Sequence, residues 1–480
     1  MIIRGKQKNW QVVIGLEVHA QMNTKYKLFS PMSKTIFGEE CNSQVSFIDV
    51  ALPGTLPRLN SECVDMAVKT GLAISARINE KSIFDRKNYF YSDLPQGYQI
   101  TQMYHPIIND GKVEIELENG ITKIIKVDRI HIEQDAGKNI HDESLDHTLI
   151  DLNRAGIGLM EIVTEPSMRA PEEAGAFLRS LRIIMRYIGS CDGNMEEGSM
   201  RCDANVSVMP DSSNFLGTRV ELKNLNSIKN VMRAIEIESH RQVEILESGG
   251  IVKQETRLFD PDKQITKSMR NKEDLADYRY FSDPNLIPII LTQDYIEKIR
   301  QTLPEMPKDK INRYIKDFCI TIDQAKIIAN DKNNAIFFEK MVYHGAQPKN
   351  AANWMISELF SYIKDIDTSP VSAENLADLV ILIDKGNISG KIAKTILEKM
   401  FIECKSANEI IALENLSQIN NKDDIIKIIK DVILNHPKEV DDYRSGRVKL
   451  FGFFVGQIMQ RSKGMANPTL VNDLLKIELK

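Results

Sequence analysis

QVVIGLEVHAQM, residues 11–22, has the alternation of a β-strand that buries one face. Its inward-facing set is apolar and consists of Val12, Ile14, Leu16, Val18 and Ala20. Glu17 and His19 share the opposite face, because successive side chains of a strand point to opposite sides of the sheet. The stretch therefore predicts a sheet that carries a carboxylate and an imidazole together on its polar face.

Three further stretches alternate in the same way and also carry acids: DRIHIEQDAGK at 128–138, SMRCDANVSVM at 199–209 and TRVELKNLNS at 218–227. Their outward-facing residues are Arg129, His131, Glu133 and Asp135, then Arg201, Asp203, Asn205 and Ser207, then Arg219, Glu221 and Lys223. One interpretation is the polar outer face of a half-solvated antiparallel sheet. The other is a site where the strands meet, whose oxygen ligands suit Mg²⁺ and whose cations suit phosphate.

The composition is that of an ordinary globular protein. The 480 residues are 42% hydrophobic and carry 62 Lys+Arg against 67 Asp+Glu, a formal net charge of −5. We find no apolar run near the roughly 20 residues that a membrane helix needs, and no apolar segment of a secretory signal. The six cysteines form no CxxC pair, which favours a reducing compartment, most simply the cytoplasm.

The chain changes character twice, which predicts an α+β protein in three blocks. Residues 1–295 read as strands with a few helices, such as a helix after Pro171 that should stop at Gly189. Residues 296–410 read as short amphipathic helices, an all-α connector. Residues 411–480 read as a small, Lys-rich helical tail. We expect a large antiparallel-sheet, cradle-like catalytic domain followed by these two helical parts.

The common nucleotide-binding motifs are missing from the sequence. The segment GNISGK at 386–391 is one residue short of a phosphate-binding P-loop and lacks the Ser or Thr after its lysine. The kinase motifs and the GxSxG elbow of hydrolases are also absent. If the protein uses ATP, it does so without these folds.

Many long motifs nevertheless resemble one family. In chain order they are IGLEVHAQM, FDRKNYFYSDLPQGYQITQ, IHIEQDAGK, DLNRAGIGLMEIVTEP, MRCDANVSV, ELKNLNS, QETRLFD, DYRYFSDP, QPKNAANW, GNISGKIAK and GFFVGQIMQRSKGMANP. Together they cover nearly the whole chain and resemble the B subunits of the heterotrimeric glutamyl/aspartyl-tRNA amidotransferases, the GatB family of GatCAB complexes.

The resemblance implies a glutamine-dependent carbon–nitrogen ligase that converts misacylated Glu-tRNA(Gln), Asp-tRNA(Asn) or both to Gln-tRNA(Gln) and Asn-tRNA(Asn). The B subunit would use ATP and Mg²⁺ to activate the side-chain carboxylate as an acyl phosphate, which ammonia then displaces. An amidase A subunit would supply the ammonia, and a small C subunit would complete the heterotrimer. The chain lacks the Ser-Ser-Lys chemistry of an amidase, which agrees with the role of the B subunit.

The resemblance and the strand pattern together nominate the site residues. We expect Glu17, His19 and Glu133 around the metal ion, and catalytic roles for Lys87, Glu133 and Asp203. The candidates for ATP or substrate contacts are Arg201, Asn205, Glu221, Lys223 and Asn224. The candidates for stacking on the terminal adenosine are Tyr89, Tyr91 and Tyr98, of which at least one should be a packing residue.

The tail is the candidate for binding the body of tRNA. Residues 421–480 hold 11 lysines and arginines against 8 acidic residues, an excess of three positive charges in a chain that is acidic overall. We expect Lys449, Arg461 and Lys463 to lie at the ends of an apolar helix and to contact tRNA. The alternative is a structural cap with a solvated basic face.

The chain also departs from the family pattern. Gln134 stands where many members have a second glutamate, which is why Glu133 receives the role. Some members have a four-cysteine zinc knuckle, but the aligned positions here are Ser30, Met32, Ser46 and Asp49. We therefore expect no zinc.

Two classes of function remain open: a catalytic subunit, or a non-catalytic tRNA-binding scaffold whose partner does the chemistry. The acid-bearing strands favour the first, because a scaffold for tRNA phosphates should be basic there.

Overall fold

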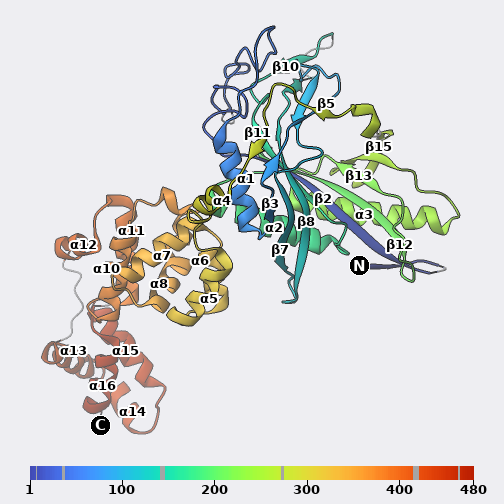
Figure 1. Cartoon of the computed structure of the whole chain (residues 1–480). Helices are drawn as coiled ribbons and strands as arrows, with labels where there is room; N and C mark the ends of the chain where they lie inside the picture. The colour runs from blue at the N-terminus through green and yellow to red at the C-terminus, as the bar shows by residue number, and fades with distance from the viewer. Residues whose placement is uncertain are drawn as a thin grey trace. The chain divides into compact units, whose positions relative to one another are not determined.

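The computed structural model describes residues 1–6, 8–34, 38–140, 146–271, 275–414, 421–462 and 465–479. The chain divides into two compact units, Met1–Met306 and Pro307–Lys480. The first is a mixed α+β unit built on a large sheet, and the second is helical (Figure 1). No helix among the described residues is long and apolar enough to span a membrane.

Within the described residues, the main sheet of the first unit has ten strands. In spatial order they are β15 (Ile265–Asn271), β14 (Glu255–Asp260), β13 (Val220–Lys223), β12 (Met200–Pro210), β2 (Asn9–Gln21), β11 (Gly158–Thr164), β8 (Thr122–Gln134), β7 (Ile108–Glu116) and β3 (Arg77–Ile78), with β1 (Ile2–Arg4) beside β2. The predicted alternation of residues 11–22 is confirmed, because Ile14, Val18 and Ala20 are fully buried.

The sheet is antiparallel except at one pair. Strands β13 and β14 run parallel, because the long helix α3 (Ile228–Glu247) connects them and returns the chain to the starting edge. The prediction of an antiparallel sheet is therefore wrong for this pair. The alternation of residues within a strand says nothing about the direction of the neighbouring strand. The sequence pattern therefore could not predict that α3 makes β13 and β14 parallel.

Helices cover one face of this sheet, leaving the other for polar side chains. Helix α1 (Ser61–Ala73) packs against β7 and β8, α2 (Pro171–Ile188) against β7, and α3 against β12 (Figure 1). The predicted end of α2 is confirmed, since Gly189 takes the left-handed conformation at φ 74°.

A second, small sheet contributes to the polar face. It has the order β16 (Phe281–Ser282), β5 (Asp85–Asn88), β6 (Tyr98–Thr101). Gln99 Nε2 donates to the Gln134 carbonyl at 2.8 Å and Thr101 Oγ1 to Glu133 Oε2 at 3.1 Å, which ties β6 to β8. The remaining elements of the unit are β4 (Lys81–Ser82), β9 (Lys138–Ile140), β10 (Leu149–Asp151), β17 (Ile289–Ile290), the 3-10 turn η1 (Leu275–Tyr278) and α4 (Gln293–Arg300).

The region of the zinc knuckle in some relatives is held together by a buried ion pair. Lys27 Nζ donates to Asp49 Oδ2 at 3.1 Å and to the Gln44 carbonyl at 2.7 Å. Ser30 Oγ and the Ser46 amide also donate to Asp49. These donors satisfy the carboxylate in the way that a buried charge requires.

The described residues of the second unit form two hydrophobic clusters. Its helices are α5 (Pro307–Phe318), α6 (Ile322–Ala329), α7 (Lys332–Tyr343), α8 (Pro348–Trp354), the π-helical turn η2 (Met355–Leu359), α9 (Phe360–Tyr362), the 3-10 turn η3 (Ile366–Thr368), α10 (Ala373–Asp384), α11 (Gly390–Glu403), α12 (Ala407–Glu414), α13 (Lys422–Asn435), α14 (Pro437–Arg444), α15 (Leu450–Arg461) and α16 (Pro468–Glu478). One cluster spans residues 314–410 and the other residues 425–479. The three-block division at 295 and 410 stays a prediction.

Candidate active site

The polar face of the main sheet gathers its charged residues by strand register. His131, Glu161 and His19 lie directly opposite one another on β8, β11 and β2, and Arg201 on β12 continues the row. Directly opposed residues of antiparallel strands project from the same face and lie close together. The register therefore builds one polar row across four strands.

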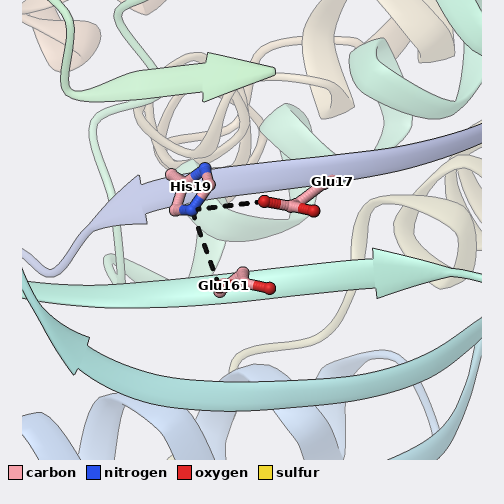
Figure 2. Close-up of side chains that lie close together, drawn as sticks. All are labelled: Glu17, His19 and Glu161. Atoms are coloured by element: carbon pink, nitrogen blue, oxygen red, sulfur yellow. Dashed lines mark ion pairs between the residues drawn. The ribbon is translucent and has the colours of Figure 1, made fainter. Parts of the chain in front are cut away.

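Three glutamates surround the His19 imidazole. His19 Nε2 lies 3.8 Å from Glu17 Oε1, 3.6 Å from Glu133 Oε1 and 3.7 Å from Glu161 Oε2. Figure 2 shows His19 between Glu17, on its own strand, and Glu161, on the neighbouring strand. The expected grouping of Glu17, His19 and Glu133 is thus present in space, and Glu161 joins it. We call these four residues the acid cluster.

Glu161 is the member that sequence reasoning missed. It lies in GLMEIVT, where Met160 and Ile162 are fully buried and Glu161 is the single charge in an apolar run. That lone acid in a core-like strand was the available signal. The signal was missed because the sequence does not show that β11 lies between β2 and β8, which places Glu161 beside His19 in the folded sheet.

The acid cluster is electrostatically strained. Burial raises the pKa of Glu133, and the nearby charge of Glu161 adds to this effect, bringing it to about 7. Burial also raises the pKa of Glu17. Burial opposes protonation of His19, but the three surrounding glutamates outweigh it and raise the pKa of His19 to about 9. The cluster attracts positive charge.

The donor set fits a divalent cation. Within the part of the chain that the structure describes, Glu17, His19 and Glu161 form the one group whose ligating atoms all lie within 4.8 Å of one another. Two carboxylates and an imidazole, with Glu133 beside them, suit a hard cation such as Mg²⁺. Such binding would release a proton from His19, because a metal takes the neutral imidazole.

Lys87 supplies a positive charge beside the acid cluster. It lies on β5 of the small sheet, which Thr101 ties to Glu133. Burial disfavours its charged form, but Glu133, Tyr280 and Glu161 outweigh burial and raise the pKa of Lys87 above its usual value. The lysine is therefore charged at neutral pH.

The other nominated cations are already engaged with carboxylates. Arg201 Nη2 donates to Asp135 Oδ1 at 2.9 Å, and Lys223 Nζ donates to Asp203 Oδ2 and lies 3.7 Å from Glu221 Oε1.

Two buried polar atoms beside these pairs lack a partner. In the described structure, they are Arg201 Nε and Asn205 Oδ1. Unsatisfied buried polar atoms are rare, so a missing ligand is one explanation for these two.

Three further candidates, Asn224, Tyr98 and Tyr91, lie outside the acid cluster. Asn224 has φ +67° and donates to the Phe259 carbonyl at 3.0 Å, which is a contact that shapes the chain. Tyr98 packs under the Arg86 guanidinium, 4.0 Å from its ring centroid. Tyr91 is exposed.

The tail candidates lie in the helical unit. Lys449 precedes α15 and Arg461 ends it, as expected, and Arg461 pairs with Asp431 at 2.5 Å. Lys463 lies outside the described residues.

Comparison with known proteins identifies the family. Residues 12–297 match the family model described as GatB/GatE catalytic domain, and residues 336–479 match the one described as GatB domain. The chain is 52% identical over 481 residues, 99% of each chain, to the B subunit of the aspartyl/glutamyl-tRNA(Asn/Gln) amidotransferase of Rickettsia rickettsii. It is also 52% identical over 482 residues, 100% of this chain and 99% of the relative, to that of Rhodospirillum rubrum.

Proposed function

The chain belongs to the GatB/GatE family, and on that premise we propose that it is the carboxylate-activating B subunit of a tRNA-dependent amidotransferase. Its substrates are ATP and misacylated Glu-tRNA(Gln), Asp-tRNA(Asn) or both. Its partners are an amidase A subunit, which supplies ammonia, and a small C subunit. The observation that carries the proposal is the convergence of the acid cluster and Lys87 on one face of the sheet.

The reaction explains why such residues gather. An oxygen of the aminoacyl side chain attacks the γ-phosphorus of ATP, the bond to ADP breaks, and an acyl phosphate forms. Ammonia then attacks the carbonyl carbon, phosphate leaves and the nitrogen loses a proton. Phosphoryl transfer depends mainly on positioning and on neutralising charge.

Each group has a part in this scheme. Glu17, His19 and Glu161 would hold Mg²⁺, which would neutralise phosphate charge. Lys87 binds phosphate oxygens. Glu133, whose Oε2 accepts from Thr101, takes the proton of the attacking ammonia at Oε1.

The cations that are paired in this structure orient the site. Asp203 holds the Lys223 amine, and Asp135 holds Arg201. Arg201 Nε remains able to donate to ATP or to the substrate carboxylate, and Asn205 Oδ1 remains able to accept from a hydroxyl or amino group of ATP. The acid cluster argues against a scaffold for tRNA phosphates, which would need a basic surface here.

The test replaces Glu17, His19 or Glu133 by alanine in the assembled complex. We expect ATP-dependent amidation to fall about 100-fold or more in each variant. For Glu17 and His19 the reason is that metal-assisted stabilisation of phosphoryl charge is worth several kcal/mol, and for Glu133 that a general base contributes on the order of 100-fold or more. Glutaminase activity should stay measurable. With labelled ATP, misacylated tRNA and no glutamine, the parent enzyme should form ADP and an activated intermediate. Near-normal amidation in all three variants contradicts the assignment.

We further propose that the tail, residues 411–480, binds the body of tRNA through Lys449, Arg461 and Lys463. Deleting the block from residue 412 should raise KM for tRNA and flatten its dependence on salt, because phosphate contacts give affinity rather than chemistry. Glutaminase activity and assembly of the complex should persist. Unchanged tRNA affinity across a salt series would assign the block to a structural role.

We also propose that the chain needs no zinc and acts in the cytoplasm. The set Ser30, Met32, Ser46 and Asp49 lacks the nitrogen and thiolate ligands of a structural zinc site, and Asp49 already binds Lys27.

A further inference from the structure

Lys87 is held by aromatic rings. Its amine lies 4.9 Å from the ring centroid of Tyr278 and 5.9 Å from that of Tyr89. Among the described residues, no carboxylate makes an ion pair with it. A cation over an aromatic face is attracted by the negative potential of the ring, most strongly when water is excluded.

The rings form a cluster of their own. Tyr278 meets Tyr89 edge to face at 6.3 Å and Tyr280 at 6.0 Å between centroids. Burial raises the pKa of Tyr89 and of Tyr280 to about 12, so both phenols stay neutral. We call Tyr89, Tyr278 and Tyr280 the tyrosine cluster.

Neighbouring contacts fix the segment that carries Tyr278. Asn88, the residue after Lys87, donates from Nδ2 to the Tyr278 carbonyl at 3.2 Å and to the Arg279 carbonyl at 2.8 Å. Strand β16 pairs with β5 directly afterwards, with Phe281 opposite Arg86. The Tyr278 ring is therefore set at a defined place relative to Lys87.

The neighbouring Arg86, unlike Lys87, is held by a carboxylate. Its Nε donates to Asp283 Oδ2 at 2.7 Å, and the Asp283 side chain is fully buried. A carboxylate partner fixes a cation but competes with an incoming anion. An aromatic face orients the ammonium and leaves its charge available.

We propose that Tyr278 is a positioning residue whose ring holds the Lys87 ammonium beside the acid cluster without neutralising it. This inference rests on the proposed function, in which Lys87 binds phosphate. It assigns to DYRYFSDP the task of orienting a catalytic lysine on another strand.

The experiment changes the electrostatics of the ring while keeping its shape. In the reconstituted complex, position 278 receives phenylalanine carrying none, one, two or three ring fluorines, which progressively remove the negative potential of the face. We expect Tyr278→Phe to stay near the parent kcat, and kcat for amidation to fall stepwise across the series by roughly 3-fold to 30-fold in total. KM for tRNA should not change.

The matched control is the same series at Phe281. That ring lies 5.8 Å from Arg86, which already has its carboxylate, so fluorination there should leave kcat unchanged. A flat series at position 278, or equal losses at both positions, overturns the proposal. Because every fluorinated ring has nearly the same shape, misfolding does not obscure the result.

A double-mutant cycle separates this inference from the proposed function. Lys87→Met should reduce amidation strongly, and Tyr278→Leu should then add no further loss in that background. If Lys87→Met is harmless, the proposed role of Lys87 fails and the inference fails with it. If Lys87→Met is severe and the Tyr278→Leu loss is fully additive, the inference alone fails.

Discussion

Two groups of carboxylates among the described residues of the main sheet domain differ in how fully hydrogen-bond donors satisfy them. One is the acid cluster on the polar face. The other centres on Glu238 of α3, whose side chain is fully buried beside β14 and β15. Buried charges need partners, so the contacts of each set indicate its purpose.

Glu238 is saturated with donors. Its Oε1 accepts from Arg241 Nη2 at 2.6 Å and from Gln242 Nε2 at 2.9 Å. Its Oε2 accepts from Arg241 Nε at 2.8 Å and Thr266 Oγ1 at 3.0 Å, with Arg257 Nε at 3.5 Å. This network joins the helix to the edge of the sheet and has no room for a ligand.

The glutamates of the acid cluster have fewer hydrogen-bond donors than Glu238. These three glutamates lie 3.6 to 3.8 Å from the His19 imidazole, which is longer than a direct hydrogen bond. Their further contacts are few: Thr101 Oγ1 donates to Glu133 at 3.1 Å, and His131 Nε2 lies 3.8 Å from Glu161. Uncompensated buried charge is what a site for a cationic cofactor and a polar substrate requires. We therefore expect saturation with donors to distinguish a structural carboxylate in this domain from a functional one.

The largest effect expected from this difference is on folding. Glu238→Ala leaves Arg241 and Arg257 with Glu255 alone as a carboxylate partner, and breaking a buried charge pair costs up to about 3–5 kcal/mol. The free energy of unfolding of the first unit should fall by that amount. Urea unfolding can follow the unit through Trp10, which donates to Glu247 of α3, in a Trp354→Phe background.

The same variant should keep its chemistry. Amidation per folded complex, measured at a temperature where the variant remains folded, should match the parent, because Glu238 lies on the helix-covered side. If Glu238→Ala lowered turnover but not the free energy of unfolding, Glu238 would have to be a functional rather than a structural carboxylate.

Glu161→Gln should give the opposite result for activity. The change keeps the shape of the side chain but removes a charge of the proposed metal site, so amidation should fall about 100-fold or more. The free energy of unfolding should also fall, though by less than for Glu238→Ala, because His131, His19 and Lys87 outweigh burial and hold the pKa of Glu161 below its usual range, so its charge stabilises the folded protein. Steady-state amidation and the Trp10 unfolding curve measure the two effects.

Glu165→Gln is the matched control. It changes the same residue type four positions along the chain, where Glu165 is half exposed and lies 3.7 Å from Lys126. Both activity and stability should stay near the parent. If Glu161→Gln is as active as Glu165→Gln, the cation is held elsewhere.

Much of this arrangement follows from local sequence. Alternation found the strands β2, β8, β12 and β13 and the face on which Glu17, His19 and Glu133 lie, because strand period is a local property. The end of α2 at Gly189 is equally local. These features need no knowledge of distant segments.

What alternation cannot give is the neighbour of each strand. Glu161 joins His19 because β11 inserts between β2 and β8, and Lys87 reaches the site through a separate small sheet. The pairing of Lys223 with Asp203 depends on the register of β12 and β13. Such contacts are set by the packing of the whole domain, so the strand pattern nominated Glu17, His19 and Glu133 and missed Glu161, which the fold places beside them.

The smallest expected effect concerns two glutamates of a single helix. Glu236 lies two residues before Glu238 on α3. It pairs with Arg233 at 2.7 Å, and the side chains of Glu236 and Arg233 are each close to half exposed. An exposed i,i+3 pair contributes about 0.3–0.5 kcal/mol, and alanine regains a similar amount through its helix propensity. Glu236→Ala should therefore change the free energy of unfolding by less than about 0.5 kcal/mol in the Trp10 assay. If Glu236→Ala lowered the free energy of unfolding as much as Glu238→Ala does, the loss would depend on where the residue lies on α3. It would then not depend on how deeply the carboxylate is buried or how many donors it has.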